Sequence, residues 1–237
     1  MTNLPRPCLM LVTEPSPRLP QIAGEAVGGG INVVQLRDKR AAAHGLRLTF
    51  KGLGQSLRRG TIVTVNADWQ RAAGFGARHI HLPENSVPVG VVRHHLGSGA
   101  LVGKSAHSVE AALKAASQGA DYIIAGTIFA SSSHPDIEPA GLDFLRDVCA
   151  AVSIPVLAIG GVTPENLGAC IETGAAGVAV LSRIMRATDP KAAAQAYRAA
   201  LDTAWEERTH PAINRDPGAT VYPASFLRGV PDPETDE

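Results

Sequence analysis

The sequence predicts a protein of the α/β class, a single-domain (β/α)8 TIM barrel with a C-terminal extension. Short runs rich in Val, Ile and Leu recur eight times along the 237 residues, and Ala-rich amphipathic stretches separate them. Continuously apolar runs are typical of parallel strands covered on both faces, and eight strand–helix units close a barrel. An open doubly wound sheet is the alternative, but no Gly-x-Gly-x-x-Gly motif follows the first run.

The eight apolar runs are the expected strands. They are Cys8–Thr13, Val33–Leu36, Thr61–Asn66, His79–Leu82, Leu101–Lys104, Tyr122–Phe129, Val156–Ile159 and Val178–Leu181. Amphipathic stretches such as Val109–Ser117 and Leu142–Val152 are expected to form helices between strands, and Pro190–Glu207 is expected to form the last barrel helix.

Capping residues and glycines mark the ends of the expected helices. Ser108 can cap one helix, and Thr163 followed by Pro164 indicates the start of another. Each of the pairs Gly76-Ala77, Gly119-Ala120 and Gly174-Ala175 stands shortly before a strand. Glycine there suits the left-handed position that closes a helix, so these pairs support the repeat.

The barrel is expected to span residues 1–208, because the composition changes afterwards. Residues 209–237 are rich in Pro, Asp and Glu, which predicts a disordered or loosely wrapped tail. The alternative is a segment that docks on the barrel or on a neighbouring subunit through Tyr222 and Phe226. The sequence leaves open whether the protein is a homo-oligomer.

Composition excludes several classes of protein. Lys and Arg together number 22, as do Asp and Glu, so neither a nucleic-acid footprint nor a membrane-attracting surface is expected. The apolar run from Cys8 to Val12 is too short for a signal peptide or a membrane span. Three scattered cysteines suggest neither disulfides nor a zinc site, so we expect a cytoplasmic protein.

The last two strands predict an anion site. Both run directly into small residues, and in a barrel of this kind the loops after the seventh and eighth strands commonly bind phosphate through main-chain N–H groups. The residues expected at this site are Gly160, Gly161, Val180, Leu181 and Ser182.

The second strand ends in a cationic cluster. Gln35 and Arg37 share a face, and Lys39 lies just beyond them. Two cations and an amide donor suit a phosphorylated ligand, although Arg37 and Lys39 could instead pair with Glu14 or Asp38 at the rim.

Polar residues also end the third, fourth and fifth strands. Asn66 could hydrogen-bond a heterocycle or cap the next helix, and Ser105 shares a face with His107. His107 is a candidate general acid–base, or a helix cap. His79 and His81 could be ligand-facing or satisfied core residues.

The loop after the sixth strand is rich in hydroxyl groups. Ser131 and Ser133 could donate to phosphate or carboxylate oxygens, and His134 is a second candidate acid–base. No Gly-x-Ser-x-Gly or His-Glu-x-x-His motif occurs, so serine hydrolases and zinc proteases are excluded.

These segments, in this order, resemble the thiamine phosphate synthase/TenI family over roughly residues 8 to 200. The matching pieces are Val34–Lys39, Asn66, His81-Leu82, Gly103 with Ser105, Gly119–Tyr122, Pro139–Leu142, Ala158–Val162 and Gly177–Ser182.

The resemblance implies a TIM barrel that binds small phosphorylated heterocycles. Synthases of the family join a pyrimidine diphosphate to a thiazole phosphate. By resemblance, the pyrimidine diphosphate would face Gln35, Arg37, Lys39, Asn66 and Ser105. The thiazole phosphate would lie between the Ser131–Ser133 loop, Gly161 and Leu181-Ser182.

The chain departs from the synthase pattern where the family binds magnesium. Ala67 and Ser86 replace the two magnesium-binding Asp residues, and His134 replaces a lysine that faces pyrophosphate. A metal that stabilises developing pyrophosphate contributes several kcal/mol, roughly 10³-fold in rate. These departures favour the metal-free TenI branch of thiazole phosphate tautomerases.

The leading hypothesis is therefore a thiazole phosphate tautomerase of thiamine biosynthesis that uses neither metal nor cofactor. His107 or His134 would move the proton, while Arg37 or Lys39 would neutralise the substrate carboxylate. Thr127 argues against it, because family tautomerases carry their catalytic His there.

Two alternatives stay open. One is a thiamine-phosphate synthase whose Mg²⁺ is held by Asp68 or Glu84, and the other is a non-catalytic ligand-binding regulator.

Overall fold

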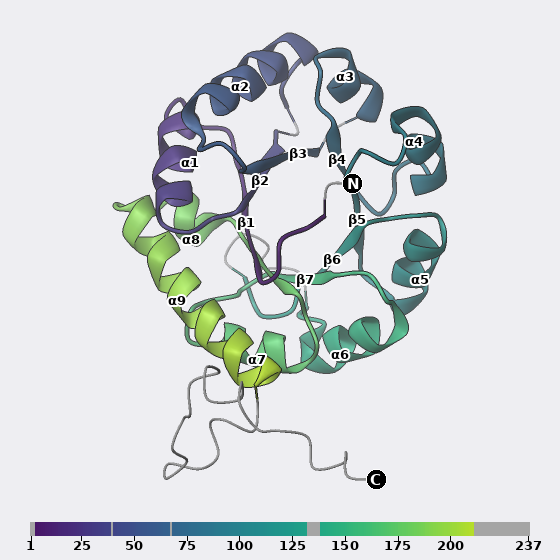
Figure 1. The fold of residues 1–237 in the computed structure, drawn as a ribbon, viewed down its shortest axis with the longest axis vertical. Helices are drawn as coiled ribbons and strands as arrows, with labels where there is room; N and C mark the ends of the chain where they lie inside the picture. Colours follow the sequence, from purple (N-terminus) through teal and green to yellow (C-terminus); the bar gives the residue numbers. More distant parts are fainter. Residues whose placement is uncertain (1–2, 39, 67, 132–137, 211–237) are drawn as a thin grey trace, which may run out of the picture.

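The computed structural model describes residues 3–38, 40–66, 68–131 and 138–210. Eight parallel strands form a closed barrel, and helices surround it (Figure 1). The predicted fold class is confirmed.

The elements alternate along the chain in the expected order. The strands are β1 (Cys8–Val12), β2 (Val33–Arg37), β3 (Ile62–Asn66), β4 (His79–Leu82), β5 (Val102–Ala106), β6 (Tyr122–Gly126), β7 (Val156–Ile159) and β8 (Gly177–Val180). The helices are α1 (Leu19–Gly28), α2 (Ala43–Ser56), α3 (Trp69–Gly74), α4 (Val89–Leu96), α5 (Val109–Ser117), α6 (Gly141–Ala151), α7 (Leu167–Glu172), α8 (Ser182–Met185) and α9 (Pro190–Thr209).

The barrel closes where β1 pairs with β8. Cys8 lies opposite Gly177, and Leu11 lies opposite Val180, in parallel register. Every other strand pairs with its neighbours in sequence. All eight strands therefore end on one face of the barrel, where their loops gather.

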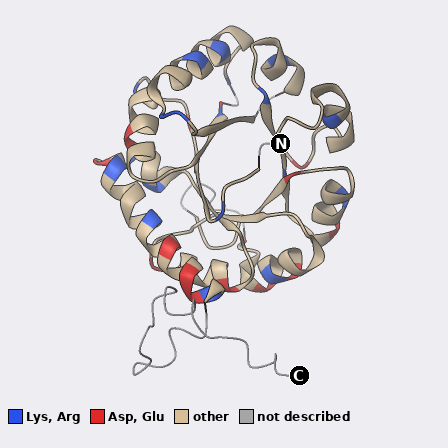
Figure 2. Ribbon diagram, in the orientation of Figure 1, with Lys and Arg blue, Asp and Glu red and all other residues tan. Residues whose placement is uncertain are grey.

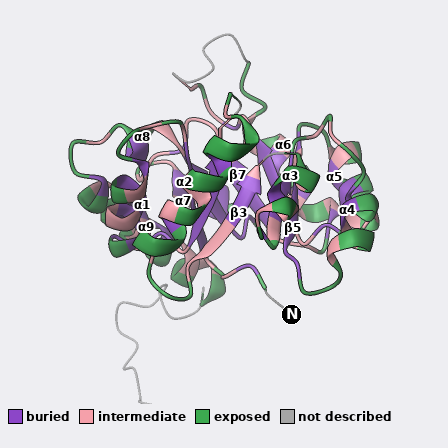
Figure 3. Ribbon diagram, turned by 90° about the horizontal axis from the view of Figure 1, so that it is seen from above, coloured by how far each residue is buried: buried purple, intermediate pink, exposed green. Residues whose placement is uncertain are grey.

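Two apolar cores hold the barrel. Alternate strand side chains pack outward against the helices, while a smaller cluster that includes Met10, Tyr122 and Leu157 fills the barrel interior. Figure 3 shows the strands buried at the centre of the molecule and the outward sides of the helices exposed. Gly103 leaves room for this interior, because a Cβ there would lie 2.1 Å from the Tyr122 ring.

The end of β6 and the start of α7 differ most from the prediction, and the other strand ends differ by at most two residues. β6 stops at Gly126, three residues before the predicted end at Phe129. The prediction that a helix starts after Thr163 was wrong, because α7 begins at Leu167. The Asn166 side chain instead accepts a hydrogen bond from the Thr163 N–H at 2.7 Å, which forms a turn before the helix.

The predicted capping signals are otherwise confirmed. Ser108 accepts a hydrogen bond from the Ala111 N–H at 3.1 Å and caps α5. Gly76, Gly119 and Gly174 have φ angles of 89°, 89° and 105°, in the left-handed region that favours glycine.

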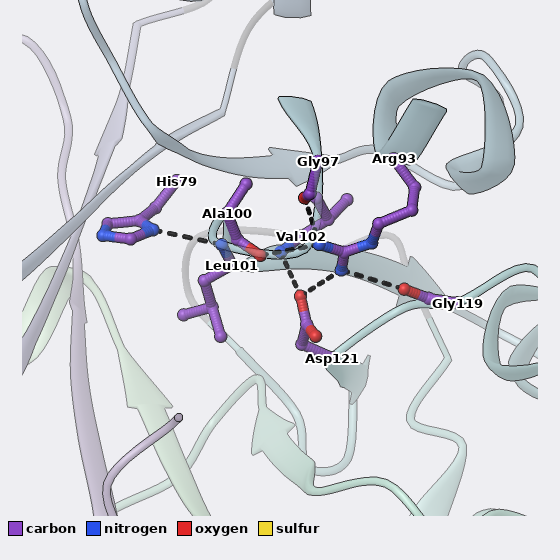
Figure 4. Close-up of polar contacts among 8 residues, drawn as sticks. All are labelled: His79, Arg93, Gly97, Ala100, Leu101, Val102, Gly119 and Asp121. Atoms are coloured by element: carbon purple, nitrogen blue, oxygen red, sulfur yellow. Dashed lines mark hydrogen bonds and ion pairs between the residues drawn. The ribbon is translucent and has the colours of Figure 1, made fainter. Parts of the chain in front are cut away.

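The face opposite the strand ends carries a polar network around Arg93 (Figure 4). The Arg93 guanidinium donates to the carbonyls of Gly97, Ala100 and Gly119, and it forms an ion pair with Asp121. One side chain thus ties α4 to the loops that precede β5 and β6.

Asp121 and His79 complete this network. The Asp121 carboxylate also accepts from the Val102 N–H at 2.6 Å, and His79 Nδ1 accepts from the Leu101 N–H at 3.1 Å. Burial lowers the pKa of His79, and the nearby Arg78 lowers it further. His79 is therefore a neutral acceptor within the fold. Of the two alternatives for it, a ligand-facing residue or a satisfied structural residue, the structure contains the second.

The outer surface carries charges of both signs. Figure 2 shows Lys and Arg beside Asp and Glu on the helices, including α9. No helix among the described residues is long and apolar enough to cross a membrane. Cys8, Cys149 and Cys170 are free thiols. Of the predicted tail, residues 209–237, Thr209 is the last residue of α9, and residues 211–237, with Tyr222 and Phe226, lie outside the described residues.

Candidate active site

A cavity of about 970 Å³ opens at the C-terminal ends of the strands. Active sites of TIM barrels occur on this face. Most of the predicted site residues line it: Gln35, Arg37, Asn66, Ser105, His107, Ser131, Gly160, Gly161, Val180, Leu181 and Ser182. Lys39, Ser133 and His134 lie outside the described residues, so their predicted roles stay untested.

Gln35 and Asn66 form one polar pair on the cavity floor. The Asn66 amide Nδ2 donates to Gln35 Oε1 at 3.2 Å, and Gln35 is almost fully buried. The helix after Asn66 is capped by Asp68, whose carboxylate accepts from two main-chain N–H groups. Asn66 is therefore not the helix cap, and it lines the cavity together with Gln35.

His81 forms a second polar group with residues of two other strands. Its Nε2 lies 2.9 Å from Ser105 Oγ, and its Nδ1 lies 3.2 Å from the Tyr122 hydroxyl. Burial lowers the pKa of His81 to about 3, and the charges of Lys104 and Arg37 act in the same direction. The neutral ring has one donor and one acceptor nitrogen, so it fixes the orientation of the Ser105 hydroxyl.

Arg37 does not pair with the rim carboxylates. Glu14 instead forms a two-pronged ion pair with Arg186, at 2.8 and 2.9 Å, and Asp38 accepts from two main-chain N–H groups of the following loop. Among the described residues, Arg37 has no salt-bridge partner. Its positive charge is available to a ligand.

Two glycines after β7 bring the main chain close to the β6 loop. Gly160 and Gly161 have φ angles of 97° and 62°. A Cβ on Gly160 would lie 2.3 Å from Thr127 Cγ2, and one on Gly161 would lie 2.3 Å from the Ala130 carbonyl oxygen. Only glycine fits either position without displacing the neighbouring loop.

Polar contacts hold this glycine turn from behind. Asn166 Nδ2 donates to the Gly161 carbonyl at 3.1 Å, and the buried Tyr197 hydroxyl donates to the Val162 carbonyl at 2.7 Å. Next to the turn, the short helix α8 starts at Ser182. The N–H groups of Ile184 and Met185 donate to the Leu181 carbonyl, which leaves those of Ser182 and Arg183 at the start of the helix, beside the cavity.

His107 contacts a carboxylate at the cavity rim. Its Nδ1 and its main-chain N–H both meet Glu84 Oε2, the latter at 2.7 Å. The alternative prediction, that His107 caps a helix, was wrong, because Ser108 caps α5. Glu84 thereby fixes the ring through Nδ1 and leaves Nε2 without a role in this contact.

The described residues do not fit the magnesium site that the resemblance implies. Ala67 lies outside the described residues, and Ser86 donates to the Pro83 carbonyl while accepting from Lys104 Nζ at 3.0 Å. Asp68 caps a helix and Glu84 holds His107, so both proposed substitutes have other partners. No cluster of three His, Cys, Asp or Glu side chains suited to a metal occurs in the described part of the chain.

Two cations at the cavity were not singled out by sequence reasoning. Arg71 and Arg183 line it, from α3 and from α8. Arg183 follows Ser182 directly, so its place in the first turn after β8 was a usable signal. Arg71 offered none, since one basic residue in a helix is most often surface-exposed.

The model of one protein family, described as thiamine monophosphate synthase, matches residues 9–184. Curated relatives include the thiamine-phosphate synthase of Haloarcula marismortui, 39% identical over 191 residues, which is 77% of this chain and 89% of that protein. The thiamine-phosphate synthase of Methanoculleus marisnigri is 40% identical over 179 residues, 75% of this chain and 85% of that protein.

Solved structures agree with the family match. Thiamine phosphate pyrophosphorylase from Pyrococcus furiosus superposes with a TM-score of 0.74 at 30% identity, and the match covers 83% of this chain and 96% of that one. A 3-hexulose-6-phosphate synthase superposes with a TM-score of 0.64 at 19% identity, over 81% of this chain and 99% of that one, and so shows the barrel fold alone.

Proposed function

Because the chain belongs to the thiamine monophosphate synthase family, we propose that it is a thiamine-phosphate synthase. In this reaction the bond from the pyrimidine methylene carbon to the diphosphate oxygen breaks. A bond from the same carbon to the thiazole nitrogen forms, and pyrophosphate leaves. The curated relatives favour this alternative over the tautomerase that the sequence departures suggested.

The observation that carries the proposal is the division of one cavity into two polar ends. Side chains from β2 to β5 supply one end, with Arg37, Asn66 and Ser105. Main-chain groups after β7 and β8 supply the other, around Gly161 and Ser182. A cavity of about 970 Å³ is as large as the upper range of small-molecule sites, which suits two heterocyclic substrates at once.

The two ends suit different ligands. The glycine turn and the start of α8 offer N–H groups to a compact phosphate, as is common after the seventh and eighth strands of such barrels. The Gln35–Asn66 and His81–Ser105 pairs offer oriented donors and acceptors to a heterocycle. Arg37 supplies charge to a departing anion.

Positioning is the contribution expected of this arrangement. Holding the two reactants in line converts a bimolecular step into one within a single complex, which can contribute about 7–11 kcal/mol toward the barrier. The buried, hydrogen-bonded pairs on the floor keep their geometry before substrate arrives, because neither Gln35 nor His81 is free to turn.

A coupling assay tests the proposal. The purified 237-residue chain is incubated with the pyrimidine diphosphate and the thiazole phosphate, both with and without Mg²⁺, and thiamine phosphate and pyrophosphate are both quantified. Equimolar appearance of the two products supports the proposal. Absence of both, at substrate concentrations where binding is saturated, overturns it.

The rim contact between His107 and Glu84 favours a second candidate, the thiazole phosphate tautomerase. A carboxylate that orients an imidazole through Nδ1 is a common arrangement for general acid–base catalysis. His107 Nε2 would move a proton on the thiazole carboxylate phosphate held at the β7–β8 end. Isomerisation of that compound by the wild-type chain, lost in His107→Ala, would support this candidate. Absence of isomerisation by the wild type would exclude it, and an unchanged rate in His107→Ala would exclude the role of His107.

A further inference from the structure

Lys104 is a buried cation behind the loop that joins β4 to α4. Its neighbour Ser105 points into the barrel toward His81, so Lys104 points to the opposite side of β5. Its Nζ lies 3.0 Å from Ser86 Oγ, 3.1 Å from the Val87 carbonyl oxygen and 3.5 Å from the Ser86 carbonyl oxygen. Only 8% of the residue is exposed.

All three contacts of this ammonium are to neutral oxygens. Within the described part of the chain it has no salt-bridge partner. Burial lowers the pKa of Lys104, the charge of Glu84 opposes this shift, and Lys114 adds to it. A buried charge is normally paired, but Glu84 lies beyond salt-bridge distance of this ammonium, so the geometry leaves part of its charge for an anion supplied from outside the chain.

The loop that Lys104 holds is also a wall of the cavity. Glu84, Ser86 and Val87 all line it. The Lys104 ammonium is therefore hydrogen-bonded directly to two residues that line the cavity, Ser86 and Val87.

The cavity carboxylates are each hydrogen-bonded within the chain. Asp38, Asp68 and Glu84 are the carboxylates among the described lining residues, and each accepts hydrogen bonds from N–H groups of the chain. Ser86, which stands where the resemblance places a magnesium ligand, is hydrogen-bonded to the ammonium instead.

We infer that the Lys104 ammonium supplies the positive charge at the β4–β5 end of the cavity, and that this end binds diphosphate without a divalent cation. Lys104 acts through the loop and is a positioning residue. The inference rests on the proposed function only for the nature of the anion, which is the diphosphate of one substrate and the pyrophosphate product.

Titration of the chelator-treated, full-length chain with inorganic pyrophosphate tests the inference by calorimetry. The wild type is expected to bind in the presence of EDTA. Lys104→Met is expected to weaken binding at least tenfold, and Lys104→Arg to restore most of it. Lys114→Met removes an exposed lysine of α5 and is the matched control, with affinity within twofold of the wild type.

A second variant covers the case in which Lys104→Met does not fold. Ser86→Asp keeps the lysine packed but places a carboxylate beside its ammonium. It is expected to weaken pyrophosphate binding in EDTA as strongly as Lys104→Met does, with no loss of the melting temperature. The inference is overturned if the wild type binds pyrophosphate only when Mg²⁺ is added, or if Ser86→Asp binds as tightly as Lys114→Met.

The outcomes separate this inference from the proposed function. A chain that fails to form thiamine phosphate, yet binds pyrophosphate in a Lys104-dependent manner, contradicts the proposed function alone. A chain that forms thiamine phosphate only with added Mg²⁺ contradicts the inference alone.

Discussion

The two faces of the barrel use polar groups in opposite ways. At the N-terminal face, the Arg93 guanidinium and the Asp121 carboxylate are satisfied by each other and by main-chain groups (Figure 4). At the C-terminal face, Arg37 has no salt-bridge partner among the described residues, and Lys104 contacts only neutral oxygens. The N-terminal face therefore maintains the fold, whereas the C-terminal face leaves positive charge available for ligands.

The largest effect is expected at the N-terminal face, from loss of the Arg93 network. Arg93→Ala removes an ion pair and three hydrogen bonds to carbonyls, and it leaves Asp121 partly buried without its cation. The free energy of unfolding should fall by about 3 kcal/mol, measured by urea denaturation. The value of kcat/KM per folded molecule should not change.

Arg146→Ala is the matched control for this prediction. Arg146 pairs with Asp143 on the exposed face of α6, so its loss should change stability by less than about 0.5 kcal/mol. Equal losses in the two variants would mean that the Arg93 network contributes no more than a surface ion pair.

The next largest effect is expected at the C-terminal face, from a change in the glycine turn after β7. In Gly161→Ala the new Cβ would lie 2.3 Å from the Ala130 carbonyl oxygen at a φ of 62°, so the turn must shift. Strain of this kind is of the order of 1–3 kcal/mol, and affinity for thiazole phosphate should drop by about 100-fold in calorimetry.

Gly45→Ala provides the contrast within the same chain. Gly45 lies in α2 with nothing within 4 Å of its added Cβ, so the change should stabilise the helix by about 0.5–1 kcal/mol and leave binding unaltered. Tight thiazole phosphate binding by Gly161→Ala would show that the phosphate lies elsewhere.

A smaller effect is expected on the floor of the cavity. Asn66→Ala removes one hydrogen bond to Gln35 and one ligand-facing amide, so kcat/KM of the coupling reaction should fall about tenfold, about 1.4 kcal/mol. Stability should change by less than about 1 kcal/mol. Gln21→Ala, which removes an exposed amide of α1, should leave kcat/KM unchanged, and an equal loss there would contradict a specific role for Asn66.

The last prediction compares one histidine from each face by pH. Both His79 and His81 have a lowered pKa in the folded chain, and that of His81 falls to about 3. The unfolded chain therefore takes up protons first, so stability present above about pH 6.5 is lost as the pH falls. Each fully buried histidine adds a slope of about 1.4 kcal/mol per pH unit below that value.

Urea denaturation between pH 7 and pH 5 measures this slope. His81→Gln should flatten the decline more than His79→Gln, because His81 is fully buried and His79 is half-buried. His44→Gln, which alters an exposed residue of α2, should leave the slope as it is in the wild type. A steeper effect from His79 would reverse the assignment of the two environments.

Much of the fold followed from the sequence because each strand is a continuous apolar run. β4 and β7 have the predicted bounds, and the glycines before strands have the predicted conformation. The start of α7 did not follow, because Thr163-Pro164 has the composition of a helix start while the Asn166 side chain makes a turn there.

The site was predictable where position along a strand decides orientation. Gln35, Arg37 and Ser105 line the cavity, as strand alternation required. Contacts made by the loop after β4 were not predictable. Glu84 meets His107, and Ser86 meets Lys104 of β5, because neighbouring strands bring residues about 20 positions apart together. The orientation of the His81 ring was not predictable either, because it depends on a contact with Tyr122, which lies two strands away.

The central claim, that one cavity holds the two reactants at opposite ends, is tested most directly by a crystal structure of the protein with thiamine phosphate and pyrophosphate. We expect the phosphate of thiamine phosphate within hydrogen-bond distance of the main-chain N–H groups of Gly161 and Ser182, and pyrophosphate beside Arg37 and Ser105. A thiamine phosphate group bound at the β2–β5 end, or ligands outside the cavity, would contradict it.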